Sequence, residues 1–202
     1  SFEYLNQCYN IWFEDDLIEK YEKIKEVFFD LSFNKEYSEE TIMEKKKNNK
    51  LLLFTVYRGK NSEGINFSND QARMVICVGV PFPNLSDIKV QLKRDFLNKK
   101  NLLEKNDFDG KTWYKEEAMN AVNQSLGRLI RNINDYGIMI CFGVEFLEHI
   151  GYLTKWIRNN KIEIVSLNDN EEKYFQNLTK FLSNSREKYP VIDNNSDNIY
   201  YE

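Results

Sequence analysis

The chain contains 202 residues, of which 42% are hydrophobic, 30% are charged and 14% are aromatic, and its formal net charge is -4. This length supports one or two domains with a hydrophobic core, and the aromatic content excludes a wholly disordered chain. No apolar stretch approaches the roughly 20 residues of a membrane-spanning helix, so the composition favours a soluble protein. The small net charge provides no global attraction to nucleic acid.

The first fifty residues have the pattern of helices around one short strand. Ser1 precedes apolar residues at helical spacing, and its hydroxyl can accept a hydrogen bond from a free amide of the first turn, so we predict a helix that begins here. The same reasoning predicts a short helix over residues 17–25, a strand over residues 27–31 and a charged surface helix over residues 37–47.

Three apolar runs predict the strands of a parallel sheet. Residues 51–57, 72–80 and 138–142 are rich in β-branched and large apolar side chains, which is typical of strands covered on both faces. Two helical segments, residues 87–103 and 112–131, lie between the second and third runs. Strands that alternate with helices indicate an α/β domain with right-handed crossovers.

The last fifty residues have a weaker pattern. We predict a short helix over TKWIRN, a strand over KIEIVS and a closing helix over residues 171–188. No repeat and no linker divides the chain, so we expect one domain over residues 1–190, with a helical C-terminal extension, and a flexible tail over residues 191–202.

Three features that often mark functional sites are weak here. The three cysteines are far apart in the sequence, which argues against a disulfide framework and a zinc site. His149 is the only histidine, so neither a histidine pair nor a multi-histidine metal site can form, and no metal site is expected. The tripeptide that begins at Gly110 resembles the end of a P-loop, but no strand precedes it, and we interpret it as the start of a helix.

The stretch GKNSEGINF, residues 59–67, is a small polar loop that follows a predicted strand. In open α/β sheets, ligands bind beyond the carboxyl ends of the strands. Backbone amides and the Ser62 hydroxyl could approach a phosphate there. An ordinary connection between strands would have a similar composition, so this pattern alone leaves both interpretations open.

The predicted helix over residues 112–131 carries two arginines on its polar side. At about 100° per residue, Gln124, Arg128 and Arg131 lie within a stripe about 60° wide. Arg128 has no acidic residue three or four positions away, and Arg131 has only Asp135. Unpaired guanidinium groups suit a triphosphate presented by another surface, whereas a solvated arginine face is the alternative. The opposite arc is apolar and contains Ala118, Met119, Val122, Leu126, Leu129, Ile130 and Ile133.

Two long segments are informative together: TVYRGKNSEGINFSNDQARMVICVGVPFPN and WYKEEAMNAVNQSLGRLIRNINDYG. In order and spacing they resemble the second motor domain of superfamily-two DNA helicases of the XPD type. That family's pattern runs RGK-x-SEG-I-DF, then AR-x-VI-x-x-G-PFPN, then WY-x-x-A-x-x-x-x-NQ-x-x-GR-x-IRH-x-x-DYG. SFEYLNQCYNIW and LTKWI are similar to flanking elements of the same domain, and PFPNLSDIKVQLKRDF is nearest the FANCJ and RTEL branch.

The resemblance implies a RecA-like parallel sheet flanked by helices, in a nuclear ATP-dependent DNA helicase of DNA repair that moves 5′ to 3′. ATP and Mg²⁺ would be bound mainly by a first motor domain, which is absent from this chain. An iron-sulfur cluster would belong to that other half, and this chain alone would not hydrolyse ATP. The implied partners are single-stranded and duplex DNA, the first motor domain of the same polypeptide, and proteins of a repair complex.

The resemblance also assigns residues. Arg128 and Arg131 would be arginine fingers, and Gln124 would sense the nucleotide. The remaining residues lie on or near the glycine-containing loop: Glu63, Gly64 and Asn66 toward the nucleotide, and Ser1, Arg58, Lys60 and Ser62 toward DNA.

Four positions depart from the family pattern. Asn66 replaces an aspartate, Asn132 replaces a histidine, and Gly143 and Glu145 stand where the family has an acidic and a basic residue. Asparagine can hydrogen-bond a ribose without charge, and Glu145 reverses a sign. Asn66, Gly143 and Glu145 motivate an alternative function, a catalytically weakened helicase-like scaffold that binds partner proteins. A third alternative is a single-stranded DNA-binding module without turnover.

Overall fold

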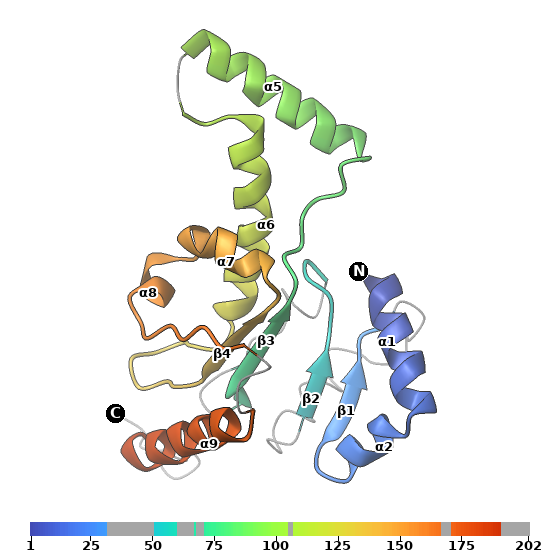
Figure 1. Cartoon of the computed structure of the whole chain (residues 1–202), viewed down its shortest axis with the longest axis vertical. Helices are drawn as coiled ribbons and strands as arrows, with labels where there is room; N and C mark the ends of the chain where they lie inside the picture. Colours follow the sequence, from blue (N-terminus) through green and yellow to red (C-terminus); the bar gives the residue numbers. More distant parts are fainter. Residues whose placement is uncertain (32–50, 60–66, 68–70, 105–106, 167–170, 191–202) are drawn as a thin grey trace, which may run out of the picture.

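The structure is a computed structural model that describes residues 1–31, 51–59, 67, 71–104, 107–166 and 171–190 (Figure 1). The strands are β1 (Glu26–Phe29), β2 (Leu51–Phe54), β3 (Met74–Val78) and β4 (Ile138–Phe142). The helices are α1 (Phe2–Glu14), α2 (Leu17–Glu22), α5 (Ile88–Glu104), α6 (Gly110–Leu126), α7 (Glu145–His149), α8 (Lys155–Arg158) and α9 (Glu171–Lys188), with the 3-10 helix η2 (Ile150–Tyr152). This mixed architecture of parallel strands and helices confirms the predicted α/β class.

The described strands form two parallel pairs, β1 with β2 and β3 with β4. Parallel pairing agrees with the prediction, but coverage on both faces is wrong for β3. Met74, Ile76 and Val78 are 40%, 56% and 55% exposed, because alternate side chains of this strand face away from the core.

The first core lies between α1 and the pair β1–β2. The Ser1 hydroxyl accepts from the Tyr4 amide at 3.3 Å, which confirms the predicted helix start. The helix then packs Leu5 and Trp12 on the strands, where the rings of Phe29 and Phe54 stack at 4.5 Å. Aromatic stacking and burial together fix α1 beside this strand pair.

The second core lies between α6 and the pair β3–β4. Met119, Val122 and Leu126 are at most 1% exposed and recur at helical spacing, so one face of α6 is fully buried against Cys77 of β3. Burial of each such side chain contributes about 1.5–3 kcal/mol. The Asn123 side chain also donates to the Tyr152 carbonyl at 2.9 Å and accepts from the Thr154 amide at 3.0 Å. The C-terminal half of α6 is therefore a rigid support.

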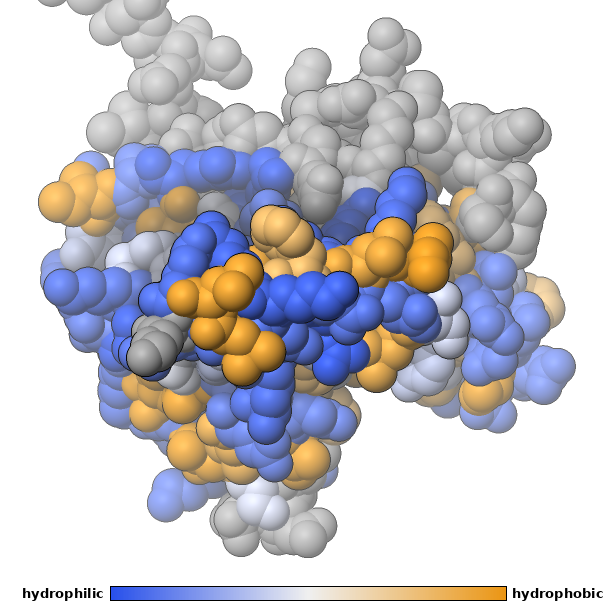
Figure 2. All heavy atoms as spheres, turned by 90° about the horizontal axis from the view of Figure 1, so that it is seen from above, coloured by the Kyte–Doolittle hydropathy of each residue, from blue (hydrophilic) through white to orange (hydrophobic). Residues whose placement is uncertain are grey.

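Helix α5 and the start of α6 project from the body of the molecule (Figure 1). The two helices approach closely at Gly110, where a Cβ atom would lie 2.5 Å from the Arg94 carbonyl oxygen. Apolar residues remain at the surface of α5, among them Leu92 and Phe96, which are 61% and 59% exposed. Figure 2, seen from above, shows such apolar patches among hydrophilic side chains.

Several predicted boundaries need correction. Helix α6 ends at Leu126 rather than at residue 131, and α2 ends at Glu22 rather than at residue 25. KIEIVS is not a strand, because residues 161–166 are exposed and pair with no described strand. The helix predicted over residues 37–47 and the tail over residues 191–202 lie outside the described residues. Helix α7 and η2 were not predicted.

Candidate nucleotide and DNA interface

The predicted site residues that the structure describes lie at opposite ends of the strands (Figure 1). Arg58 follows the carboxyl end of β2, and Ser1 lies near the same end; we call this region the carboxyl end. Arg128 and Arg131 lie between α6 and the first residue of β4, and Gln124 is in the last turn of α6; we call this region the amino end. The polypeptide from residue 59 to residue 73 leads from the first region to the second.

The amino end is built on a loop of residues 127–137, which we call the arginine loop. After α6, the amides of Arg128 and Leu129 donate to carbonyls three residues earlier, at 3.2 Å each, so the helix tightens into a turn. This turn buries Leu129, which is 1% exposed, but it leaves Ile133 94% exposed. The predicted apolar arc is therefore correct at Leu129 and wrong at Ile133, since the helix does not continue.

Asp135 closes the arginine loop. One carboxylate oxygen accepts from the backbone amides of Arg131 and Asn132, at 2.8 Å and 3.3 Å. The other oxygen lies 4.0 Å from the Arg73 guanidinium. The acidic residue nearest Arg131 in the sequence thus binds its backbone, not its side chain.

Among the described residues, the two arginine side chains of the loop have no counterion. Arg131 and Gln124 are exposed and Arg128 is half-buried. Within the described ranges, no carboxylate forms an ion pair with either guanidinium and no hydrogen bond holds any of the three side-chain ends. The arrangement presents two positive charges and one amide at the same end of the strands, which suits a phosphate-bearing ligand.

The carboxyl end is organised differently. Arg58 has a backbone φ of +59°, and its guanidinium donates to the Glu117 carbonyl at 2.8 Å and faces the Glu117 carboxylate at 3.5 Å. Gly59 is needed next to it, because a Cβ atom would lie 2.9 Å from the Val56 carbonyl oxygen. The predicted residues Lys60, Ser62, Glu63, Gly64 and Asn66 lie outside the described residues.

Gly143, one of the departures from the family pattern, has a structural cause. Its φ is +135°, a conformation that side chains rarely adopt, and a Cβ atom would lie 2.7 Å from a Glu145 carboxylate oxygen. An aspartate in this backbone would be strained. The sequence signal for this feature was the glycine directly after the strand.

Buried polar groups near the strand pair are structural. Cys77 and Cys141 are in register on β3 and β4, and both are free thiols. Burial raises the pKa of Cys77 to about 11 and, together with the neighbouring Cys77, that of Cys141 to about 12. Burial also raises the pKa of Tyr57, whose hydroxyl donates to the Gly79 carbonyl at 3.2 Å. These groups stay protonated at neutral pH, which makes them poor nucleophiles.

His149 is also structural. It is 5% exposed, and its Nδ1 lies 2.7 Å from the Glu145 carbonyl oxygen. In the described part of the chain, no cluster of three or more histidine, cysteine, aspartate or glutamate side chains could hold a metal ion. None of the described helices has the length and apolar character needed to cross a membrane.

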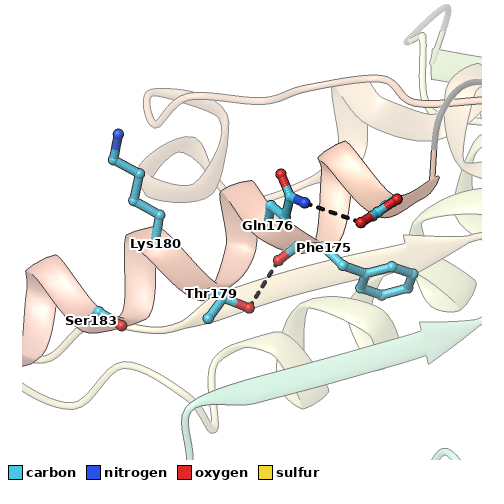
Figure 3. A pocket seen from close by; sticks show the side chains of 6 residues that line it. Phe175, Gln176, Thr179, Lys180 and Ser183 are labelled. Carbon is cyan, nitrogen blue, oxygen red and sulfur yellow. Dashed lines mark hydrogen bonds between the residues drawn. The ribbon is translucent and has the colours of Figure 1, made fainter.

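Two hollows of the described surface lie elsewhere. Figure 3 shows one along α9, where Gln176 donates to Glu172 at 3.3 Å and the Thr179 hydroxyl donates to the Phe175 carbonyl at 2.9 Å. All residues that line it belong to this single helix. A second hollow lies between α1, α2 and β1. Neither contains a predicted site residue.

The sequence and fold are those of a known class of protein. The chain belongs to the helicase C-terminal domain family, which matches residues 1–160. It is 36% identical over 165 residues to the "Regulator of telomere elongation helicase 1 homolog" of Drosophila grimshawi, over 79% of this chain and 17% of the relative. It is also 36% identical over 155 residues to the "ATP-dependent DNA helicase CHL1" of Debaryomyces hansenii, over 72% of this chain and 19% of the relative.

These comparisons confirm the predicted resemblance to XPD-type helicases of the FANCJ and RTEL branch. The chain spans less than a fifth of the length of either relative.

Proposed function

We propose that residues 1–190 are the second motor domain of an ATP-dependent DNA helicase, and that this domain works with a first motor domain of the same polypeptide. The observation that carries the proposal is the pair of guanidinium groups, Arg128 and Arg131, that lack counterions among the described residues. Membership of the helicase C-terminal domain family supports it.

Arg128 and Arg131 act as arginine fingers in this proposal. ATP and Mg²⁺ are held mainly by the first motor domain, and the two guanidinium groups reach the phosphates from across the interface. Negative charge on the transferred phosphoryl group is stabilised by such donors, and an arginine finger contributes about 10³ to 10⁵ in rate in well-studied nucleotidases. Gln124 contacts the nucleotide beside them. The loop residues Glu63, Gly64 and Asn66 complete the nucleotide side.

DNA binds at the carboxyl end. Ser1 and the free amides at the start of α1 offer a phosphate site, because a helix N-terminus carries partial positive charge. Arg58, Lys60 and Ser62 add contacts to the backbone of single-stranded DNA. The connection over residues 59–73 joins the two ends, and it couples nucleotide hydrolysis to movement along DNA.

The names of the relatives support a setting for this activity. One relative is named for telomere elongation and the other for ATP-dependent DNA helicase activity. We place the present protein in the nucleus, in DNA repair, with 5′ to 3′ movement, and with repair-complex proteins as further partners.

Single-turnover ATP hydrolysis tests the arginine fingers. In the polypeptide that joins this chain to a first motor domain, Arg131→Ala and Arg128→Ala should each slow hydrolysis by about a hundredfold or more. Arg186→Ala is the matched control, because Arg186 is an exposed arginine on α9, just before Tyr189, whose ring stacks on Tyr136 of the arginine loop, and it is not a predicted finger. Wild-type rates for both finger variants would refute the proposal.

The backbone at Gly143 favours a second candidate function, a helicase-like scaffold with weakened catalysis. The family has an acidic residue at this position, and its side chain would be strained at the positive φ of Gly143. Glu145 is acidic where the family has a basic residue. A polypeptide that binds DNA but shows no DNA-stimulated hydrolysis, with or without the finger substitutions, would favour the scaffold over the motor.

A further inference from the structure

The Asp135 carboxylate is a buried charge with an uncommon set of partners. Its side chain is 4% exposed, and both of its oxygens face donors. One oxygen accepts from the amides of Arg131 and Asn132, and the other faces the guanidinium of Arg73. A buried carboxylate is costly unless donors and opposite charge surround it, so this network holds the loop in one conformation.

Arg73 ties the same loop to the beginning of β3. Its guanidinium lies 4.2 Å from the centre of the Tyr136 ring and donates to the Tyr136 carbonyl at 3.4 Å. Its own carbonyl accepts from the Ile138 amide at 2.9 Å. Arg73 and Tyr136 are 63 residues apart in sequence. Arg73 is also the last residue of the connection that begins after Arg58. Arg73 is therefore the point where that connection meets the arginine loop.

We infer that Asp135, held in place by Arg73, is the positioning residue for Arg131. The inference rests on the proposed function, because it concerns where an arginine finger points. Asp135 binds the backbone amide of Arg131 and so fixes the residue that carries this side chain. It forms no ion pair with the Arg131 guanidinium. A displacement of about 1 Å in a group that contacts reacting atoms can cost about a hundredfold in rate.

A merely structural role for Asp135 makes a different prediction. If the carboxylate only closes the loop, its removal lowers the stability of the domain but leaves kcat of the folded enzyme unchanged. If it positions Arg131, its removal lowers kcat, and that loss depends on the presence of Arg131. A double-mutant cycle separates the two roles, because residues that act through one another are not additive.

The cycle uses the polypeptide with both motor domains and compares Asp135→Ala, Arg131→Ala and the double variant. Asp135→Ala should lower kcat by about tenfold or more and change KM for ATP by less than about twofold, with no further loss when Arg131 is already alanine. Asp109→Ala is the matched control. Asp109 also accepts from a backbone amide, that of Thr112 at 2.7 Å, but at the opposite end of α6. It should lower the melting temperature and leave kcat unchanged.

The outcomes distinguish the inference from the proposed function. A wild-type kcat for Asp135→Ala, or a loss that adds fully to that of Arg131→Ala, overturns the inference and leaves the arginine fingers standing. A wild-type rate for Arg131→Ala refutes the finger itself, and the inference falls with it.

A second measurement is independent of activity. Amide hydrogen exchange followed by NMR should show protection of the Arg131 and Asn132 amides, with Asp135→Ala increasing both rates about tenfold or more over the Asp109→Ala variant. Asp135→Asn keeps one acceptor oxygen but removes the charge that faces Arg73. Its exchange rates should lie between those of the unsubstituted protein and those of Asp135→Ala. Unprotected exchange of these two amides in the unsubstituted protein would overturn the inference, whether or not any variant folds poorly.

Discussion

The two ends of the strands use their charged side chains in opposite ways. At the carboxyl end, the Arg58 guanidinium is engaged by Glu117 of the same domain. At the amino end, the Asp135 carboxylate binds backbone amides, and the guanidinium groups of Arg128 and Arg131 keep no counterion within the described ranges. Exposed ion pairs contribute little, so the Glu117 partner does not exclude a phosphate at Arg58. The two ends differ in whether a ligand must first displace a carboxylate.

Helix α6 connects these two ends. Glu117 binds Arg58 near the carboxyl end, and Gln124 lies two turns later, about 10 Å along the helix axis, near the amino end. The buried side chains between them pack on β3, so the two ends are joined by a rigid helix rather than by a loop.

The largest expected effect concerns the support beneath the arginine loop. Leu129→Ala should destabilise the domain by about 2–5 kcal/mol, because it opens a cavity at a fully buried position. Ile133→Ala is the matched control in the same loop and should cost less than about 0.5 kcal/mol, since Ile133 is exposed. Urea denaturation measures both. Equal losses would mean that the helix continues past Leu126, as the sequence pattern predicted, and that the loop is not a separate unit.

A smaller effect concerns the strand pair between the two ends. Burial raises the pKa of the Cys77 thiol from 9.0 to about 11, which corresponds to about 3 kcal/mol. Because the folded pKa lies above the unfolded value, this stabilisation is complete below about pH 8.5 and is lost as the pH rises through 11.

The urea midpoint should therefore be constant between about pH 7 and 8 and fall between about pH 9 and 11. Cys77→Ala should have a lower midpoint at neutral pH and a flatter pH dependence. The same pH dependence in both proteins would assign the effect to other groups and would show that this thiol is not buried.

The parts of the fold that sequence reasoning predicted well depend on local patterns. The apolar run of β4 has the predicted bounds, Ile138–Phe142, and so does α9, because strand and helix periodicities are visible in neighbouring residues. Ser1 was identifiable as a cap for the same reason. KIEIVS shows the limit of this reasoning. Its alternation suits a strand, but a strand also needs a partner, and no described strand pairs with it.

The candidate site could be predicted only in part. Arg128, Arg131 and Gln124 were identified as an unpaired polar set, and the structure leaves them unpaired within the described residues. The predicted stripe geometry was wrong, however, because α6 ends before both arginines. The loop that takes the place of the rest of the predicted helix is held by the Asp135 network, which includes Arg73, the residue before β3. A contact between such distant segments has no signature in local periodicity.

One arginine from each end of the strands can be compared in the polypeptide with both motor domains. Arg131→Ala should slow single-turnover ATP hydrolysis by about a hundredfold and leave oligonucleotide affinity within about twofold. Arg58→Ala should weaken oligonucleotide binding and reduce its salt dependence by about one phosphate contact, with little effect on hydrolysis at saturating DNA. Equal losses of both activities in both variants, or an unchanged rate for Arg131→Ala, would contradict the division of the domain into a nucleotide end and a DNA end.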